Sequence, residues 1–419
     1  MRLNRDVNVI KNRNAQADPG IMTSVAAILK DVRENGDAAV RQYAKDFDGF
    51  TSQELMVTQV EIETATKKIG SDFIRILQRA KDQITEFHKN QIQNSWGIYK
   101  DNGVVMGQII RPLVRVALYV PGGTAAYPSS VLMNGIPAIL AGVKDIAIFT
   151  PVKADGKVPD TILAAAGVCG ISQIYKIGGA HAIAAAAYGT KSIPKADKIV
   201  GPGNIYVATA KRMVYGEVDI DMIAGPSEVL IIADEAANPI YIAADLMSQA
   251  EHDPLASSVL ITTSEKLIAE TEAEIDRQVE SLSRKDIILQ SLESYGAAVH
   301  VKSLEEAFEI SNILAPEHLE ILTADPLSHL PKVQNAGSIF LGAYTPEPLG
   351  DYMSGPNHVL PTGGTARFYS ALGVYDFVKH SSYSYYPKSA LAELKDDVMI
   401  FAKKEGLDAH AAAMGVRFE

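Results

Sequence analysis

Short apolar runs recur along most of this chain, and alanine-rich stretches with helical spacing separate them. Parallel strands that are buried on both faces have this appearance, because helices cover the sheet from either side. The alternation therefore predicts an α/β fold, with one parallel sheet for each of two successive sets of runs. The first set is VRVALYV (114–120), DIAIFT (145–150), QIYKIGG (173–179) and KIVGPG (198–203). The second set is EVLIIAD (228–234), SSVLITT (257–263), AAVHV (297–301), HLEILT (318–323) and GSIFLG (337–342).

Helical patterns flank these sheets at both ends of the chain. Apolar residues recur at helical spacing in residues 24–47, around a glycine break, and in residues 60–91. Residues 391–416 are amphipathic as well. Terminal helices often only cap a core, and the pattern alone favours that interpretation for the C-terminal segment.

The composition limits the kinds of partner. Lysine and arginine total 39 against 50 aspartate and glutamate, which gives a formal net charge of -11 at pH 7. Such a chain repels phosphate backbones and anionic membranes, so we expect a small-molecule partner, with no nucleic acid and no membrane. The single cysteine, Cys169, excludes an intrachain disulfide and a zinc site of several thiolates. With no secretory pattern and no apolar stretch of about 20 residues, we expect a cytoplasmic protein.

Glycine-rich turns follow several predicted strands and lead into predicted helices. They are YVPGGTAAYPSS (119–130), KIGGAHAIAAAAYG (176–189) and IVGPGNIYVATAKR (199–212). Parallel sheets bind ligands outside the carboxyl ends of their strands, and glycine lets the backbone approach a phosphate. Tight turns also use glycine for steric reasons alone, and none of these turns has the full GxGxxG pattern. Their clustering favours a dinucleotide site, with Tyr119 and Asn204 available for stacking and hydrogen bonding.

Polar residues in later segments are candidates for metal binding and proton transfer. Gln249 and His252 stand three positions apart in a helical pattern, within reach of one ion. Glu317 and His318 are adjacent at a loop-to-strand junction, where they would suit proton transfer. Asp351 lies in a long loop rich in glycine and proline, and its carboxylate is a possible metal ligand.

Each of these candidates also has an ordinary structural explanation. A histidine near a helix end is more often a cap or a surface group than a ligand. For the pair of Glu317 and His318, the ordinary explanation is an N-cap-like glutamate and an incidental histidine. His358, between Asn357 and an apolar pair, is better explained as a structural histidine. Cys169 ends an apolar helix with no cationic neighbour in sequence, so we expect a core residue rather than a nucleophile.

The motifs in their order and spacing resemble the histidinol dehydrogenase family. They are YVPGG, GGAHAIAA, VGPGN, DMIAGPSEVLIIAD, DLMSQAEHDP, APEHLE, GDYMSGPNHVLPT and the terminal EGLDAH. The resemblance covers nearly the whole chain, from Val25 to His410. It implies oxidation of L-histidinol through L-histidinal to L-histidine, with reduction of two NAD+, in the last steps of histidine biosynthesis. It also implies a homodimer with shared active sites and one zinc ion per subunit.

The resemblance assigns roles to individual residues. Zinc would be bound by the Gln and His of SQAEH, the Asp of GDY and, from the partner chain, the His of EGLDAH. These ligands are Gln249, His252, Asp351 and His410. Glu317 and His318 would be the proton-transfer pair. Substrate contacts would come from Ser227 and Glu405, together with His318 and the zinc ligands.

Cofactor contacts are implied for Tyr119, His181 and Asn204. The family commonly has Gln in GGAQA, where this chain has His181. Both side chains can donate a hydrogen bond, so we expect NAD+ binding with changed strength or pH dependence.

The implied fold is α/β, with two Rossmann-like parallel-sheet domains and helical N- and C-terminal extensions. We expect an N-terminal arm at residues 1–22 and a discontinuous first α/β domain at residues 23–113 and 227–370. An NAD-binding domain at residues 114–226 would be inserted into it, and residues 371–419 would form a helical dimerisation tail. A metal-dependent hydrolase and a catalytically silent binding protein are the alternatives that remain open. Neither would need both the glycine-rich turns and the Glu-His pair.

Overall fold

A computed structural model describes residues 2–8, 19–122, 126–223 and 225–419. The chain divides into two units. The large unit comprises Met1–Gln91 and Leu113–Phe377, and the small unit comprises Ile92–Pro112 and Val378–Glu419. Among the described residues, no helix is long and apolar enough to cross a membrane.

The first sheet of the large unit is parallel, with strand order β5-β4-β3-β6-β7. Its strands are β3 (Arg115–Tyr119), β4 (Asp145–Phe149), β5 (Gln173–Tyr175), β6 (Lys198–Val200) and β7 (Asp219–Ile220). The order reverses between β3 and β6, so the carboxyl ends of these two neighbours form a topological switch point. Ligands of open α/β sheets bind in the crevice at such a point.

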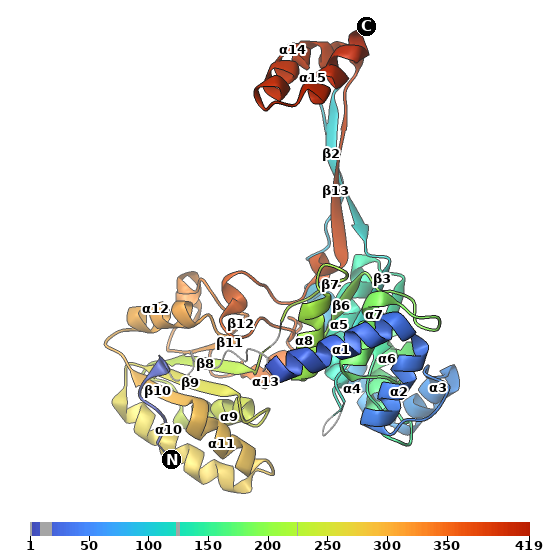
Figure 1. The fold of residues 1–419 in the computed structure, drawn as a ribbon. Coiled ribbons are helices and arrows are strands. Elements are labelled where there is room, and N and C mark those ends of the chain that lie inside the picture. The colour runs from blue at the N-terminus through green and yellow to red at the C-terminus, as the bar shows by residue number, and fades with distance from the viewer. Residues whose placement is uncertain (1, 9–18, 123–125, 224) are drawn as a thin grey trace. The chain divides into compact units, whose positions relative to one another are not determined.

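Helices from two parts of the chain cover the first sheet (Figure 1). The helices that connect its strands are α5 (Pro128–Ala141), α6 (Asp160–Cys169), α7 (Gly179–Tyr188) and α8 (Ile205–Val214). The N-terminal helices are α1 (Pro19–Asn35), α2 (Asp37–Asp48), α3 (Gln59–Lys68) and α4 (Ser71–Lys89). Helix α1 packs on α7 and α8, whereas α3 packs on α6. The alanine-rich sequence of α7 makes this close packing possible, because its small side chains are buried along the helix.

The second sheet is also parallel, with strand order β10-β9-β8-β11-β12. Its strands are β8 (Glu228–Ala233), β9 (Ser257–Thr262), β10 (Gly296–His300), β11 (His318–Leu322) and β12 (Ser338–Leu341). Its helices are α9 (Pro239–Ala250), α10 (Glu265–Gln278), α11 (Lys285–Tyr295), α12 (Leu304–Leu314) and α13 (Glu347–Tyr352). One apolar cluster joins the sheet to α9, α10 and α11, and another joins its opposite face to α12. The prediction of an α/β fold with parallel sheets is confirmed.

The small unit is a three-stranded antiparallel sheet, ordered β1-β2-β13, followed by a helix pair. Its elements are β1 (Trp96–Tyr99), β2 (Val105–Pro112), β13 (Val378–Tyr385), α14 (Lys388–Lys404) and α15 (Asp408–Gly415). Tyr383 pairs with Gly107, and any side chain at Gly107 would collide with the tyrosine ring. We expected residues 371–419 to form a helical tail, but residues 378–385 of this segment form strand β13. Its sequence, VKHSSYSY, has no apolar face that would have predicted one.

The buried cores group the N-terminal helices differently from our expectation. We expected residues 23–113 to accompany residues 227–370, but one apolar cluster joins α1–α4 to the first sheet. Val25, Val40, Ile62 and Ile84 belong to that cluster. An amphipathic helix can cover any exposed sheet face, so its place in the sequence does not decide which sheet it covers.

Candidate active site

One candidate binding surface lies at the switch point of the first sheet. Tyr119 ends β3, and its hydroxyl oxygen accepts a hydrogen bond of 3.0 Å from the Gly179 N–H at the start of α7. Burial raises the pKa of Tyr119 to about 12, so the hydroxyl keeps its own proton to donate. Residues 123–125 of the adjacent turn YVPGGTAAYPSS (119–130) lie outside the described residues.

The turn after β6 comes close to the end of β3. Gly201 has φ +109°, and a Cβ there would collide with the carbonyl oxygen of Tyr119. Asn204 caps α8, because its Oδ1 accepts hydrogen bonds of 3.1 Å from the N–H groups of Tyr206 and Val207. A hydrogen bond from Asn204 to a ligand would therefore come from its Nδ2 group.

His181 is buried on the first turn of α7, with 1% of its surface exposed. Its ring centroid lies 6.0 Å from that of Tyr43 and 5.9 Å from that of Phe47, both on α2. Both ring nitrogens have no hydrogen-bond partner among the described residues. Burial lowers the pKa of His181 to about 4, so the ring is neutral at pH 7. Buried polar atoms without partners are uncommon and favour an unfilled hydrogen-bonding role.

A second candidate surface lies at the amino ends of β8 and β11. Glu317 precedes β11 and His318 begins it, as the sequence predicted. The Glu228 N–H donates a hydrogen bond of 2.8 Å to Glu317 Oε2, and Nδ1 of His318 lies 2.9 Å from the Glu228 carbonyl oxygen. Because a carbonyl only accepts, Nδ1 carries the proton and Nε2 presents a lone pair. The arrangement gives His318 the tautomer of a general base acting through Nε2.

Burial shifts these two groups in opposite directions. It raises the pKa of the Glu317 carboxyl well above its ordinary value, and the nearby carboxylates of Glu228, Asp351 and Glu347 raise it further. It lowers the pKa of His318 to about 4, against the opposing effect of Asp351. At pH 7 the imidazole of His318 is therefore neutral, with Nε2 free to accept a proton, and the Glu317 carboxyl group is more basic than an ordinary carboxyl group.

A group of possible metal ligands lies beside His318. Ligand atoms of His252, Glu347 and Asp351 all lie within 4.8 Å of one another. Oε1 of Glu347 is 3.9 Å from Nε2 of His318. Imidazole and carboxylate ligands suit zinc and related cations. The structure therefore brings two of the predicted ligands, His252 and Asp351, into one cluster.

Gln249 stands one turn before His252. Helix α9 ends at Ala250, but the His252 N–H still donates to the Gln249 carbonyl oxygen at 3.2 Å. Gln249 is 1% exposed, and its Oε1 has no hydrogen-bond partner among the described residues. An amide oxygen left unsatisfied in the interior fits a metal ligand better than a packing residue.

Glu347 was missed by the sequence analysis. It is buried in α13, four positions before Asp351, so both carboxylates lie on one face of this short helix. Its N–H donates a hydrogen bond of 2.9 Å to Oε1 of the buried Glu320 on β11. Burial raises the pKa of Glu347 to about 8. The i,i+4 spacing with Asp351 was the signal available in the sequence.

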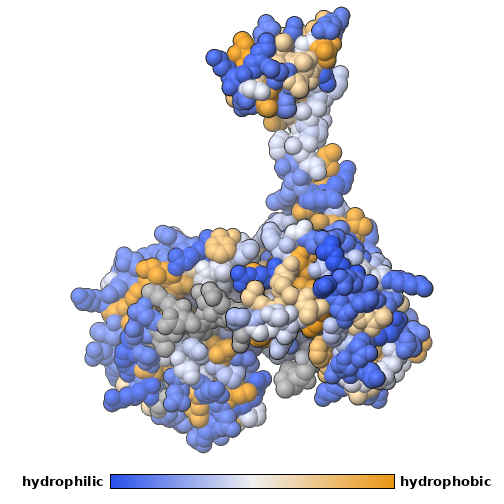
Figure 2. All heavy atoms as spheres, in the orientation of Figure 1, coloured by the Kyte–Doolittle hydropathy of each residue, from blue (hydrophilic) through white to orange (hydrophobic). Residues whose placement is uncertain are grey.

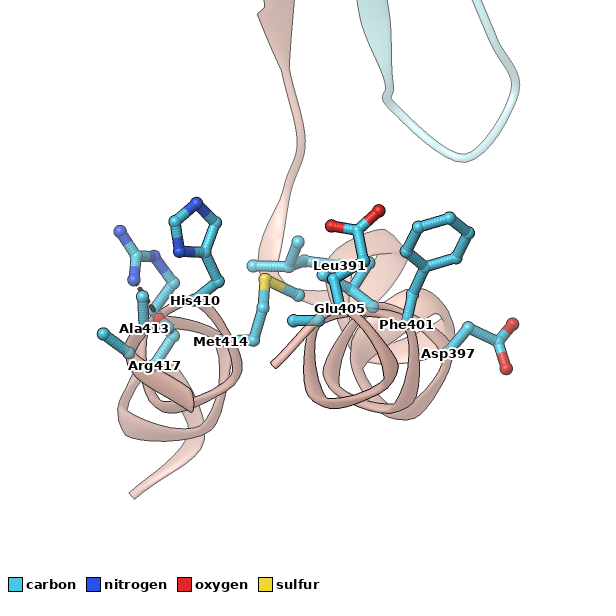
Figure 3. Close-up of a pocket in the computed structure, with 11 residues that line it drawn as sticks. Leu391, Asp397, Phe401, Glu405, His410, Ala413, Met414 and Arg417 are labelled. Carbon is cyan, nitrogen blue, oxygen red and sulfur yellow. Dashed lines mark hydrogen bonds between the residues drawn. The ribbon is translucent and has the colours of Figure 1, made fainter. Parts of the chain in front are cut away.

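The remaining predicted residues divide between the two units. Ser227 precedes β8, and its carbonyl oxygen accepts a hydrogen bond of 3.0 Å from the Ser257 N–H. Nδ1 of His358 lies 3.5 Å from Oδ1 of Asp351, so the ring has a polar partner. Glu405 and His410 belong to the small unit and are exposed. They line an open groove of about 790 Å³, and Figure 3 shows both side chains projecting from the same side of α14 and α15.

Cys169 is a core residue, as predicted. It ends α6, is buried, and its burial raises the thiol pKa to about 12. A thiol that stays protonated is a poor nucleophile. The candidate site therefore contains no reactive cysteine from the described residues.

Comparisons with known proteins identify the family of this chain. A family model described as "Histidinol dehydrogenase" matches residues 11–418. Histidinol dehydrogenase of Lactococcus lactis subsp. lactis is 62% identical over 411 residues, which is 98% of this chain and 95% of the relative. That of Clostridium acetobutylicum is 57% identical over 410 residues, again 98% and 95% of the two chains. The crystal structure of the Elizabethkingia anophelis histidinol dehydrogenase superposes with a TM-score of 0.93 at 38% identity, and the match covers 99% of this chain and 96% of that one. The chain belongs to the histidinol dehydrogenase family.

Proposed function

We propose that this protein oxidises L-histidinol through L-histidinal to L-histidine, with reduction of two NAD+. Family membership supports the substrate and the reaction type. The observation that carries the proposal is the Glu317–His318 pair, whose Nε2 lone pair lies beside a cluster of cation ligands. The reaction belongs to the end of histidine biosynthesis, and we place it in the cytoplasm.

In the first oxidation, Nε2 of His318 accepts the alcohol proton while a hydride leaves the carbinol carbon. Burial lowers the pKa of His318, so at pH 7 the ring is neutral and its Nε2 lone pair is available for this proton. In the second oxidation, Glu317 activates water, which adds to the aldehyde to form the hydrate that loses the next hydride. Its raised pKa makes Glu317 a stronger base than an ordinary carboxylate. No covalent thiol intermediate is required.

Zinc would be held by Gln249, His252, Asp351 and His410 of the partner subunit. The unsatisfied Oε1 of Gln249 and the convergence of His252 with Asp351 support the first three ligands. When bound, zinc would supply a fixed positive charge that orients the substrate. Ser227 and Glu405 would add substrate contacts.

NAD+ would bind at the switch point of the first sheet, within residues 114–226. Tyr119 ends β3, and Asn204 lies at the end of the turn that follows the neighbouring strand β6. His181 would supply a hydrogen bond from one of its unsatisfied ring nitrogens. We retain His181 as a cofactor contact of this chain in place of the usual glutamine.

We also propose a homodimer in which the small unit completes the partner's site. Among the described residues of α14 and α15, only Ala390, Ala402 and Ala411 are buried. Leu394, Val398, Ile400 and Phe401 are exposed, and Figure 2 shows hydrophobic surface on the helical end of this unit. So small a buried core is insufficient for stability by itself, and a second chain would cover these apolar side chains.

The stoichiometry of the reaction tests the function. Zinc-loaded protein is incubated with limiting L-histidinol and excess NAD+, and the NADH formed per substrate consumed is counted. Two NADH with histidine as the product support the double oxidation. One NADH would indicate an ordinary alcohol dehydrogenase, and none, together with no NAD+ binding, would favour a metal-dependent hydrolase.

Mixing inactive chains tests the shared site. His410→Ala and His318→Asn chains are each expected to be inactive alone. Refolded together, they form heterodimers in which one site retains both intact residues, so partial activity should return. Absence of any recovery in verified heterodimers would exclude sharing.

A further inference from the structure

A buried ion pair lies beneath the turn that follows β6. Lys211 on α8 pairs with Asp221 after β7, and their side chains are 3% and 1% exposed. In the other lysine and arginine pairs of the described residues, at least one partner is substantially more accessible.

Both members of the pair hold the backbone of one residue, Gly201. Asp221 Oδ2 accepts a hydrogen bond of 2.7 Å from the Gly201 N–H. Nζ of Lys211 donates one of 2.8 Å to the Gly201 carbonyl oxygen. The other carboxylate oxygen of Asp221 also accepts from the Met222 N–H at 2.7 Å. Both polar groups of Gly201 are therefore satisfied by the same ion pair.

Stability alone does not explain such a pair. Removing two charges from water costs several kcal/mol per ion, and well-packed apolar residues of similar volume are often equally stable or more so. The pair does, however, fix the position of the backbone at Gly201, since each charged group lies at hydrogen-bonding distance from it. The pair is therefore better explained as a means of holding a backbone segment in one place than as a source of core stability.

The element that it holds is the turn from Gly201 to Asn204. Gly201 has φ +109° and lies against the carbonyl oxygen of Tyr119 at the end of β3. A Cβ at Gly203 would collide with Val207 on α8, so the turn lies tightly against its own helix. Asn204 then caps that helix through two backbone N–H groups. The ion pair thus connects the turn to α8 and to the segment after β7.

We propose that Lys211 and Asp221 are positioning residues for the dinucleotide, which hold the Gly201–Asn204 turn at the switch point in the geometry that receives it. This inference rests on the proposed function, in which NAD+ binds there. Neither side chain touches the ligand, because both are enclosed beneath the turn. Their effect is on the affinity for the dinucleotide and not on the chemistry at His318.

The test replaces the pair by apolar residues, Lys211→Met with Asp221→Leu. NADH binding is titrated by its fluorescence, and zinc binding by competition with a chelator. We expect the dissociation constant for NADH and the KM for NAD+ to rise about ten-fold or more. The zinc affinity, the KM for histidinol and kcat should stay within about two-fold, since the second sheet is unchanged.

An exposed pair on the same domain provides the control. Lys195 and Glu217 lie 2.8 Å apart, with side chains 47% and 40% exposed. Lys195→Met with Glu217→Gln should change none of these quantities. If the apolar variant does not fold, Asp221→Glu provides the test. It retains the charge, but its side chain is longer by one methylene group and therefore displaces the turn. This variant should weaken NADH binding several-fold.

The outcomes separate this inference from the function on which it rests. If the unmodified protein does not bind NADH, the proposed function and the positioning role both fail. If it does bind NADH and a folded variant binds equally well, only the positioning role is refuted. Equal losses of NADH and zinc affinity would indicate a general structural defect and would also refute it.

Discussion

Replacing His181 with glutamine should make the protein less sensitive to acid. Burial lowers the pKa of His181 from 6.5 to about 4 in the folded protein, whereas the unfolded chain binds a proton near pH 6.5. Above pH 6.5 the ring is neutral in both states and contributes no pH dependence. As the pH falls below 6.5 only the unfolded chain takes up the proton, so the folded state loses stability until the pH reaches about 4.

The size of the effect follows from this difference in pKa. At pH 5, proton uptake by this histidine in the unfolded chain lowers the free energy of unfolding by about 2 kcal/mol. Below pH 4 this loss of stability levels off at about 3 kcal/mol. The cause is burial beside Tyr43 and Phe47, with no charged group contributing. Glutamine does not titrate, so the variant lacks this penalty at every pH.

Urea denaturation followed by circular dichroism, at pH 7.5 and at pH 5, measures the effect. The difference in unfolding free energy between variant and unmodified protein should shift by about 2 kcal/mol in favour of His181→Gln at the lower pH. His300→Gln is the matched control, since His300 is exposed and lacks the burial on which the expected effect depends. The same difference at both pH values would show that His181 takes up a proton in the folded state, and the argument from burial would be wrong.

Three further predictions concern the catalytic site. Cys169→Ala should retain both oxidations and two NADH per histidinol, because the buried thiol stays protonated; loss of the second oxidation alone would refute the route through water. His318→Asn should slow both oxidations, and Glu317→Gln chiefly the second, each by about 10²- to 10⁴-fold in single-turnover rates. Equal effects of Glu317→Gln on both steps would remove the distinction between the two roles. Glu347→Gln should weaken zinc binding by about 10- to 100-fold in a chelator competition, and an unchanged affinity would exclude Glu347 from the metal environment.

The strands of both large sheets could be predicted from sequence because each is a short apolar run enclosed on both faces. Strand β8, for example, is buried along its length from Val229 onward. Strand β13 lacked this signal, since nearly all of its residues are exposed and its sequence is polar. The N-terminal helices were predicted as helices, but their packing on the first sheet depends on which surface their apolar faces meet. That choice is a tertiary property that no local pattern contains.

The candidate site was predictable where its residues are neighbours in the chain. Glu317 with His318, and Gln249 with His252, were recognisable as pairs because adjacency or helical spacing brings them together. Glu347 shares helical spacing with Asp351, but its position beside His318 depends on how α13 lies against β11 and is not contained in that spacing. The ion pair of the first sheet was missed for the same reason, since its members meet only after α8 folds back on the sheet.

The catalytic pair illustrates why the fold was needed to assign roles. Strand β11 crosses to the far side of β8 instead of continuing from β10, and in this parallel register His318 stands opposite Val229. The backbone of Glu228 then reaches both catalytic residues, donating its N–H to Glu317 and presenting its carbonyl oxygen to Nδ1 of His318. A slip of one residue between the strands would break both hydrogen bonds and turn the side chains to the opposite face. The orientation of the carboxyl group and the tautomer of the base therefore depend on one peptide group of the neighbouring strand, which the order of the strands places there.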